Sequence, residues 1–178
     1  MTFLVNGLMD FAKLKSGNFR KDINNFDIRK AILDIMQAHR EKADFCGIDQ
    51  NLKMSNFPKS LETGEEDYVV CSDALRIQQI ILNLQANAIK YTPGGGSATI
   101  SCKLIKCFED LSFPEMKKFL DESKGFGMLE IKVEDTGIGI SSEDQKKLFK
   151  LFGFADKAVE VSAKGIGLGL HISQWITR

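Results

Sequence analysis

Residues 73–92, DALRIQQIILNLQANAIKYT from Asp73 to Thr92, have a pattern that predicts one helix with two unlike faces. At about 100° per residue, four apolar residues fall on one side and form a stripe that should pack on a sheet: Ile77, Ile81, Leu84 and Ala88. The other side carries a file of donors and amide oxygens without a carboxylate: Arg76, Gln79, Asn83, Asn87 and Lys90. Such a file suits an anionic, metal-bearing ligand.

The asparagines of this helix are poorly explained as ordinary surface residues. Solvated helix faces are usually built from Glu, Lys and Arg, which have a higher helix propensity than Asn. Yet Asn83 and Asn87 recur at an i, i+4 spacing in mid-helix. Local propensity is often set aside at functional sites, so we treat this face as a candidate ligand site, with a plain amphipathic surface helix as the alternative.

Length and composition limit the protein class. With 178 residues, 43% hydrophobic and 27% charged, the chain is expected to form one globular domain with an appendage. Lys+Arg and Asp+Glu are both 24, so no overall charge attracts nucleic acid or an anionic membrane. No apolar run approaches the roughly 18 residues of a membrane span, which predicts a soluble, cytoplasmic piece. This prediction concerns only the present sequence and does not exclude a membrane segment elsewhere in a longer protein.

The cysteines and histidines give no sign of a metal site. The four cysteines form no Cys-x-x-Cys pair, which favours reduced structural thiols over zinc or disulfides: Cys46, Cys71, Cys102 and Cys107. A first core helix is predicted from Ile28 to Ala43, with Asp27 as its N-cap. Because His39 falls on the apolar stripe of that helix, we expect a packed, hydrogen-bonded histidine and not a catalytic one. His171 lies far from the cysteines in sequence.

Alternating or clustered apolar residues predict four strands, at 48–56, 68–71, 98–107 and 128–134. A polar turn at 62–67 separates the first two. Residues 109–127 are expected to form a short helical insertion without chemistry of its own.

Two glycine-rich turns follow the asparagine helix. Asp135 begins D-T-G-I-G-I directly after a predicted strand, where its carboxylate could accept a hydrogen bond from the exocyclic amine of adenine. Gly137 and Gly139 permit positive φ and close approach of a ligand. The second turn, G-I-G-L-G-L from Gly165, opens the helix HISQWITR, whose free N–H groups and dipole favour phosphate. Each turn alone could be an ordinary connection.

Together, N-L-x-x-N-A-x-K-Y-T, D-T-G-I-G-I and G-I-G-L-G-L resemble the N box and the two glycine boxes of the histidine kinase ATP-binding domain, a member of the superfamily that includes gyrase-type ATPases. The resemblance implies a Bergerat-type α/β (α+β) two-layer sandwich, with a mixed sheet covered on one face by helices. It implies ATP and Mg²⁺ as ligands, with the metal held by Asn87 and assisted by Asn83, and with Lys90 facing the phosphates. The implied ATP-binding residues are Asn83, Asn87, Lys90, Tyr91, Asp135, Gly137, Ile138, Gly139, Lys164, Gly165, Ile166, Gly167, Leu168 and Gly169.

The resemblance also divides the chain. Residues 1–20 resemble the end of the second helix of a dimerisation domain, although an ordinary amphipathic terminal helix is the alternative, and residues 21–178 resemble the ATPase domain. Phe149 and Phe152 resemble the family's phenylalanine box, or they are core residues. The segment 153–164 would be a lid in which Lys157 and Lys164 either contact phosphate or face water.

The expected function is transfer of the γ-phosphate of ATP to a histidine outside this chain. The final strands and the acceptor histidine of the family are missing, so we expect a C-terminally truncated fragment that cannot phosphorylate itself in cis. The implied partners are the histidine-bearing dimerisation domain of a homodimeric parent and a response-regulator receiver domain, with no nucleic acid. A gyrase-type ATPase is the main alternative, but it has a glutamate four residues before Asn87, where this chain has Asn83, and an amide cannot act as a general base. A non-catalytic nucleotide-binding module is the other alternative.

Overall fold

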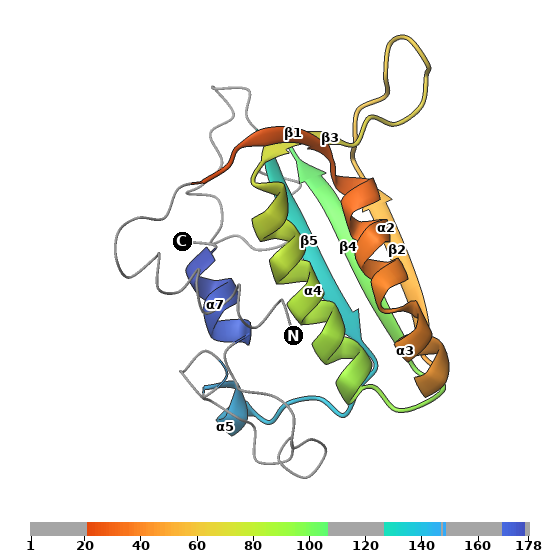
Figure 1. Cartoon of the computed structure of the whole chain (residues 1–178), viewed down its shortest axis with the longest axis vertical. Helices are drawn as coiled ribbons and strands as arrows, with labels where there is room; N and C mark the ends of the chain where they lie inside the picture. The colour runs from red at the N-terminus through yellow and green to blue at the C-terminus, as the bar shows by residue number, and fades with distance from the viewer. Residues whose placement is uncertain (1–20, 107–126, 147, 149–168, 177–178) are drawn as a thin grey trace.

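The computed structural model describes residues 21–106, 127–146, 148 and 169–176 (Figure 1). The elements in chain order are β1 (Asn24–Asp27), α2 (Ile28–Ala38), α3 (Arg40–Cys46), β2 (Asp49–Ser55), β3 (Val69–Ser72), α4 (Ala74–Tyr91), β4 (Ser97–Ile105), β5 (Met128–Asp135), α5 (Ser142–Gln145) and α7 (Gly169–Ile176). Several predictions lie outside the described residues: the N-terminal helix, nearly all of the insertion, the phenylalanine box, the lid and the second glycine box up to Leu168.

The main sheet is mixed, with the strand order β2-β4-β5. Strand β4 is parallel to β2 and antiparallel to β5, which places Leu52, Ile100 and Val133 in one row across the sheet. Strands β1 and β3 form a separate antiparallel pair. The four predicted strands are confirmed to within two residues at each end, whereas β1 was not predicted.

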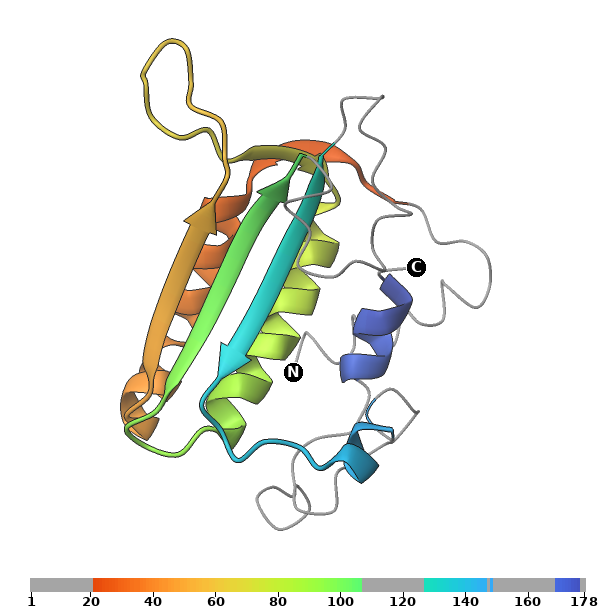
Figure 2. The same cartoon turned by 180° about the vertical axis from the view of Figure 1, so that it is seen from behind.

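Among the described residues, helices cover one face of the main sheet and none covers the other. Figure 1 shows α2 and α4 in front of the strands, and Figure 2 shows the uncovered face from behind. Ile28, Ile32 and Ile81 pack from the helices against Ile100 and Cys102 of β4. On the open face, Lys132 Nζ lies 2.8 Å from Glu134 Oε1. The predicted two-layer sandwich is therefore confirmed.

Cys102 is fully buried in this core. Burial raises the pKa of its thiol to about 12. Cys46, Cys71 and Cys102 are all free, and Cys107 lies outside the described residues.

The first helical segment is divided at His39 instead of continuing to Ala43. Asp27 caps α2 as predicted, since its Oδ1 accepts from the Lys30 N–H at 2.9 Å. The His39 N–H lies 3.2 Å from the carbonyl oxygens of both Ile35 and Met36, which tightens the turn and separates α2 from α3. Gly47, at φ +64°, ends α3 in the left-handed conformation.

The environment of the His39 ring differs in part from the prediction. The side chain is half-buried, but Nδ1 has no hydrogen-bond partner among the described residues. Burial, aided by the charge of Lys42, lowers the pKa of His39, so the ring is neutral at pH 7.

Helix α4 has the predicted length, with Asp73 as N-cap and Thr92 as C-cap. Its buried face is wider than the predicted stripe, because Gln85 and Ile89 are buried together with Ile81 and Ala88. Leu84 is only half-buried. Among the helices that the structure describes, none combines the length and apolar character needed to cross a membrane.

Candidate nucleotide site

Backbone hydrogen bonds fasten the first glycine turn to the end of α4. The Ile138 N–H donates to the carbonyl oxygen of Tyr91 at 3.1 Å. The Thr136 N–H donates to the Ser97 carbonyl oxygen at 3.0 Å, and the Ser97 N–H donates to Thr136 Oγ1 at 2.9 Å. These bonds bring residues 135–139 beside the helical turn that carries Lys90 and Tyr91, although the two segments are far apart in sequence.

Asp135 is the last residue of β5 and is paired in register with Ala98, on the sheet face that the helices cover. Its Oδ1 accepts a hydrogen bond from the Gly137 N–H at 2.9 Å. Oδ2 has no hydrogen bond with any residue that the structure describes, and the side chain is exposed. The carboxylate is thus held in place through one oxygen while the other can accept a ligand's donor.

The two glycines of this turn are required for different reasons. A Cβ at Gly137 would lie 2.5 Å from Asp135 Oδ1 and 2.6 Å from the Tyr91 carbonyl oxygen, so a side chain there would force the turn away from α4. Gly139 has open space around it but a φ of +69°, which other residues adopt at a cost. The predicted positive φ is therefore confirmed at Gly139 and is wrong at Gly137, where the close approach of the Tyr91 backbone requires glycine instead.

Asn83 joins α4 to the start of α7. Its Nδ2 donates to Ser173 Oγ at 3.2 Å, and Ser173 Oγ donates to the Gly169 carbonyl oxygen at 3.0 Å. A Cβ at Gly169 would lie 2.0 Å from Asn83 Oδ1. The last glycine of the second box therefore lies directly against the asparagine face of α4.

The remaining polar residues of α4 fall into two groups. Near the start of the helix, Arg76 Nη1 donates to Gln79 Oε1 at 3.1 Å. Near its end, the Lys90 ammonium lies 4.8 Å from the centre of the Tyr91 ring. Asn87 is half-buried, and its amide has no hydrogen bond within the described part of the chain. Asn87 and Lys90 thus remain available beside the Asp135 turn.

The structure describes nine of the fourteen predicted ATP-binding residues. These are Asn83, Asn87, Lys90, Tyr91, Asp135, Gly137, Ile138, Gly139 and Gly169. The other predicted residues, Lys164, Gly165, Ile166, Gly167 and Leu168, lie outside the described ranges.

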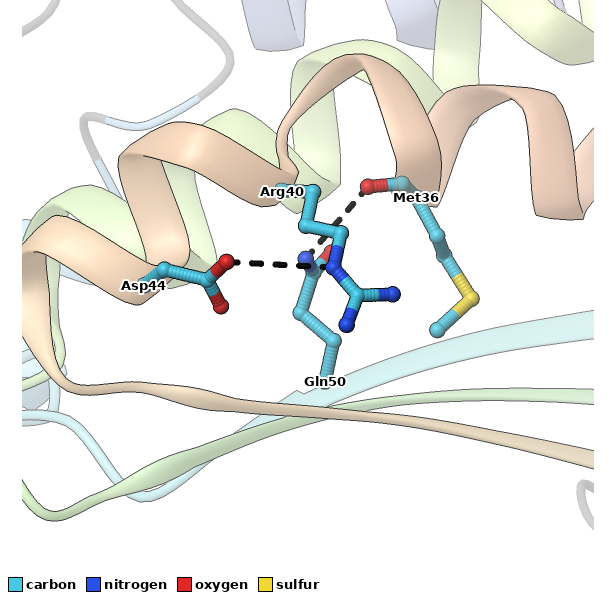
Figure 3. A network of polar contacts seen from close by, with 4 residues as sticks. All are labelled: Met36, Arg40, Asp44 and Gln50. Atoms are coloured by element: carbon cyan, nitrogen blue, oxygen red, sulfur yellow. Dashed lines mark hydrogen bonds and ion pairs between the residues drawn. The ribbon is translucent and has the colours of Figure 1, made fainter.

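The sequence interpretation missed a buried polar connection behind this site. Gln85 Nε2 donates to Gln50 Oε1 at 2.9 Å, and Gln50 Nε2 donates to the Met36 carbonyl oxygen at 3.3 Å. Figure 3 shows the second of these bonds beside the ion pair of Arg40 and Asp44, in which Nε of Arg40 lies 3.7 Å from Oδ2 of Asp44. Gln85 lies four residues after Ile81, so helical spacing alone could have placed it on the buried face.

Residues 72–178 match the model of a family described as histidine kinase-, DNA gyrase B-, and HSP90-like ATPase. The chain belongs to this ATPase family. Its similar curated relatives are histidine kinases: DivJ of Caulobacter vibrioides is 33% identical over 95% of the chain, and BarA of Escherichia coli is 30% identical over 96%. The chain is thus an ATP-binding catalytic domain of the type found in two-component sensor histidine kinases.

Solved structures of this ATPase family share the fold. The histidine kinase AdeS of Acinetobacter baumannii matches 97% of the chain and 64% of its own, with a TM-score of 0.62 at 24% identity. The catalytic domain of the histidine kinase ThkA matches 87% of the chain and 78% of its own, with a TM-score of 0.59 at 23% identity. The chain spans only 23% of DivJ and 16% of BarA.

Proposed function

We propose that the chain binds magnesium-ATP and transfers the γ-phosphate to a histidine on the dimerisation domain of a sensor kinase. The observation that carries this proposal is the backbone hydrogen bond from Ile138, in the Asp135 turn, to Tyr91. It brings a carboxylate at the end of β5 to the same end of α4 as Asn87 and Lys90.

Adenine recognition is assigned to Asp135 and the exposed apolar residues after it. Asp135 Oδ2, which Gly137 does not bind, would accept a hydrogen bond from the exocyclic amine of adenine. Ile138 and Ile140 are 55% and 48% exposed, so apolar surface lies beside that acceptor. Guanine carries a carbonyl where adenine has its amine, and two acceptors would then face each other.

The polar end of α4 suits the triphosphate. Asn87 would be the principal magnesium ligand, with Asn83 assisting through Oδ1, and Lys90 would face the phosphates. Neutral amide oxygens are acceptable ligands for a hard cation that phosphate already binds. The bound metal would neutralise phosphate charge. The glycine-rich segment 165–169 and Lys164 complete the proposed phosphate site.

The chemistry of the described site favours transfer to histidine over hydrolysis. Catalysis of phosphoryl transfer rests mainly on positioning and charge stabilisation. A neutral imidazole is already nucleophilic near pH 7, so no general base is needed for it. Asn83 stands where a hydrolase would need a base, and an amide cannot accept a proton in that role.

The partners and location follow from the same proposal. Residues 1–20 would be the end of the dimerisation domain, residues 21–178 the ATPase domain, and the parent protein a homodimer. One structural neighbour, ThkA, was solved in complex with the response regulator TrrA, with a TM-score of 0.53 at 20% identity. We propose that a response-regulator receiver domain is the downstream partner of this chain. We further propose that the chain is a cytoplasmic domain, whether or not the parent protein is attached to the membrane.

The test is calorimetric titration of the chain with ATP and GTP. Asp135→Asn should weaken ATP binding roughly tenfold to a hundredfold, because a charge-assisted hydrogen bond contributes about 1.5 to 3 kcal/mol. The matched control is Glu134→Gln, which removes the adjacent carboxylate from the open face of the sheet and should change nothing. Unchanged affinity in Asp135→Asn removes this residue from adenine recognition, and a wild-type chain that binds neither nucleotide overturns the proposed function.

A further inference from the structure

One carboxylate, that of Asp73, joins three parts of the domain. Asp73 follows β3 directly and caps α4, where its Oδ1 accepts from the Arg76 N–H at 3.1 Å. Its Oδ2 accepts from the N–H of Asp22 at 3.0 Å, 51 residues earlier in the chain. The side chain is nearly buried, with Asp73 8% exposed. Asp73 therefore holds both the start of α4 and the segment through which the chain enters the domain.

The second hydrogen bond is not needed for capping. An N-cap uses one side-chain oxygen, and Asp27 at the start of α2 shows the simple case, with Oδ1 accepting from Lys30 and no further bond in the described structure. The antiparallel register pairs Asn24 with Ser72, so Asp22 and Asp73 lie just beyond the paired ends of β1 and β3. The carboxylate thus extends the contact between the two strands by one bond.

Little else fixes the path of residues 21–23 within the described structure. All three are exposed, and Ile23 keeps 52% of its surface accessible. Leu75, in the first turn of α4, is 69% exposed, so no apolar burial holds the two segments together there. Asp22 Oδ1 accepts from Asn24 Nδ2 at 2.7 Å, but that bond is local and does not reach α4.

We propose that Asp73 is a positioning residue that fixes the direction in which the chain leaves the domain toward residues 1–20. Figure 1 shows β1 and β3 crossing the N-terminal end of α4. The opposite end of α4 carries Asn87 and Lys90. The bond between Asp22 and Asp73 therefore fixes residues 21–23 relative to the helix of the proposed nucleotide site. We call this bond, from the Asp22 N–H to Asp73 Oδ2, the clamp. The importance of the clamp for phosphoryl transfer rests on the function proposed above, whereas the existence of the clamp does not.

The test separates the clamp from the cap. Asp73→Ser keeps a good N-cap residue for α4 but leaves one short oxygen, which cannot serve both Arg76 and Asp22. Asp27→Ser is the matched control at the cap of α2. Asp22→Ala is a second control, because it removes the side chain and keeps the backbone N–H that Asp73 binds.

Amide hydrogen exchange of the chain, followed by NMR, reads the clamp directly. Asp73→Ser should lower the protection of residue 22 by about tenfold to a hundredfold, the range expected for a hydrogen bond to a charged group. Asp27→Ser and Asp22→Ala should retain it, and ATP affinity should stay unchanged in all three variants. Equal protection in Asp73→Ser and wild type overturns the clamp, as does an equal loss in Asp22→Ala.

A second readout concerns the consequence for transfer. In the parent kinase, Asp73→Ser should lower kcat for histidine phosphorylation at an unchanged KM for ATP, since the nucleotide site is intact and only its placement has changed. An unchanged kcat overturns the positioning role. A parent kinase that transfers no phosphate even without substitution contradicts the proposed function, and the exchange experiment then decides on the clamp separately.

Discussion

At the level of single residues, Asn83 and Asn87 differ in the hydrogen bonds that their side-chain amides make within the protein. Asn83 donates to Ser173, whereas Asn87 has no hydrogen bond among the residues that the structure describes. We therefore expect Asn87→Ala to impair magnesium-dependent ATP binding more than Asn83→Ala. Titration in magnesium and again in EDTA measures the difference. An equal loss of affinity in Asn87→Ala with and without metal would show that Asn87 is not the ligand.

His39 makes stability depend on pH. Burial lowers the pKa of its ring below the ordinary 6.5, so the native state resists a proton that the unfolded chain takes up. The stability is therefore complete above about pH 6.5 and falls as the pH drops toward the native pKa. His39→Gln, which cannot titrate, should lose less stability between pH 7.5 and 5.5 in urea unfolding. Parallel curves for the two proteins would exclude His39 as the cause.

At the level of elements, α4 and α7 are in contact through Asn83 and Gly169. The effect of Gly169→Ala on the free energy of unfolding should therefore depend on whether Asn83 is present. Gly169→Ala in the wild type would place a Cβ 2.0 Å from Asn83 Oδ1, and such overpacking costs about 1 to 3 kcal/mol. An Asn83→Ala background lacks the three atoms nearest to that Cβ, so alanine should be neutral or up to about 1 kcal/mol stabilising there, because glycine is a poor helix former. A double-mutant cycle of unfolding free energies measures this coupling. Additive effects would contradict the predicted contact.

The elements also show what the sequence could and could not predict. Strand β4 was predictable from its alternation, since alternate residues are buried on one face only, and the helix between Asp73 and Thr92 was predictable from its helical periodicity. Strand β1 was missed because Asn24–Asp27 has no apolar alternation and becomes a strand only through pairing with β3. Helical spacing could have placed Gln85 on the buried face, but not its hydrogen-bond acceptor, because Gln50 lies in another element.

The same limit applies to the candidate site. The set of residues that the motifs assign to this site stays a prediction, and the structure shows that the Asp135 turn lies at the end of α4. The bond between Asn83 and Ser173 spans 90 residues and leaves no pattern in the sequence. Contacts of that kind depend on tertiary packing, so only a structure reveals them.

For the molecule as a whole, α4 connects the two functional ends of the domain. Its 18 residues extend about 27 Å at 1.5 Å per residue. Asp73 binds the backbone of Asp22 at one end, and Tyr91 binds the Asp135 turn at the other. Both the segment 21–23 and the proposed adenine-binding turn are therefore attached to the same helix.

We propose that this domain transfers phosphate from ATP to a histidine. The most direct test supplies the chain with magnesium and ATP labelled at the γ-phosphate, with and without a separate dimerisation domain that carries the acceptor histidine. We predict label on the acceptor as an acid-labile, base-stable product, with phosphate release near background when the acceptor is absent. Asp135→Asn should reduce the transfer at limiting ATP. Rapid phosphate release without any acceptor, abolished by Asp135→Asn, would contradict the kinase assignment and identify a gyrase-type hydrolase.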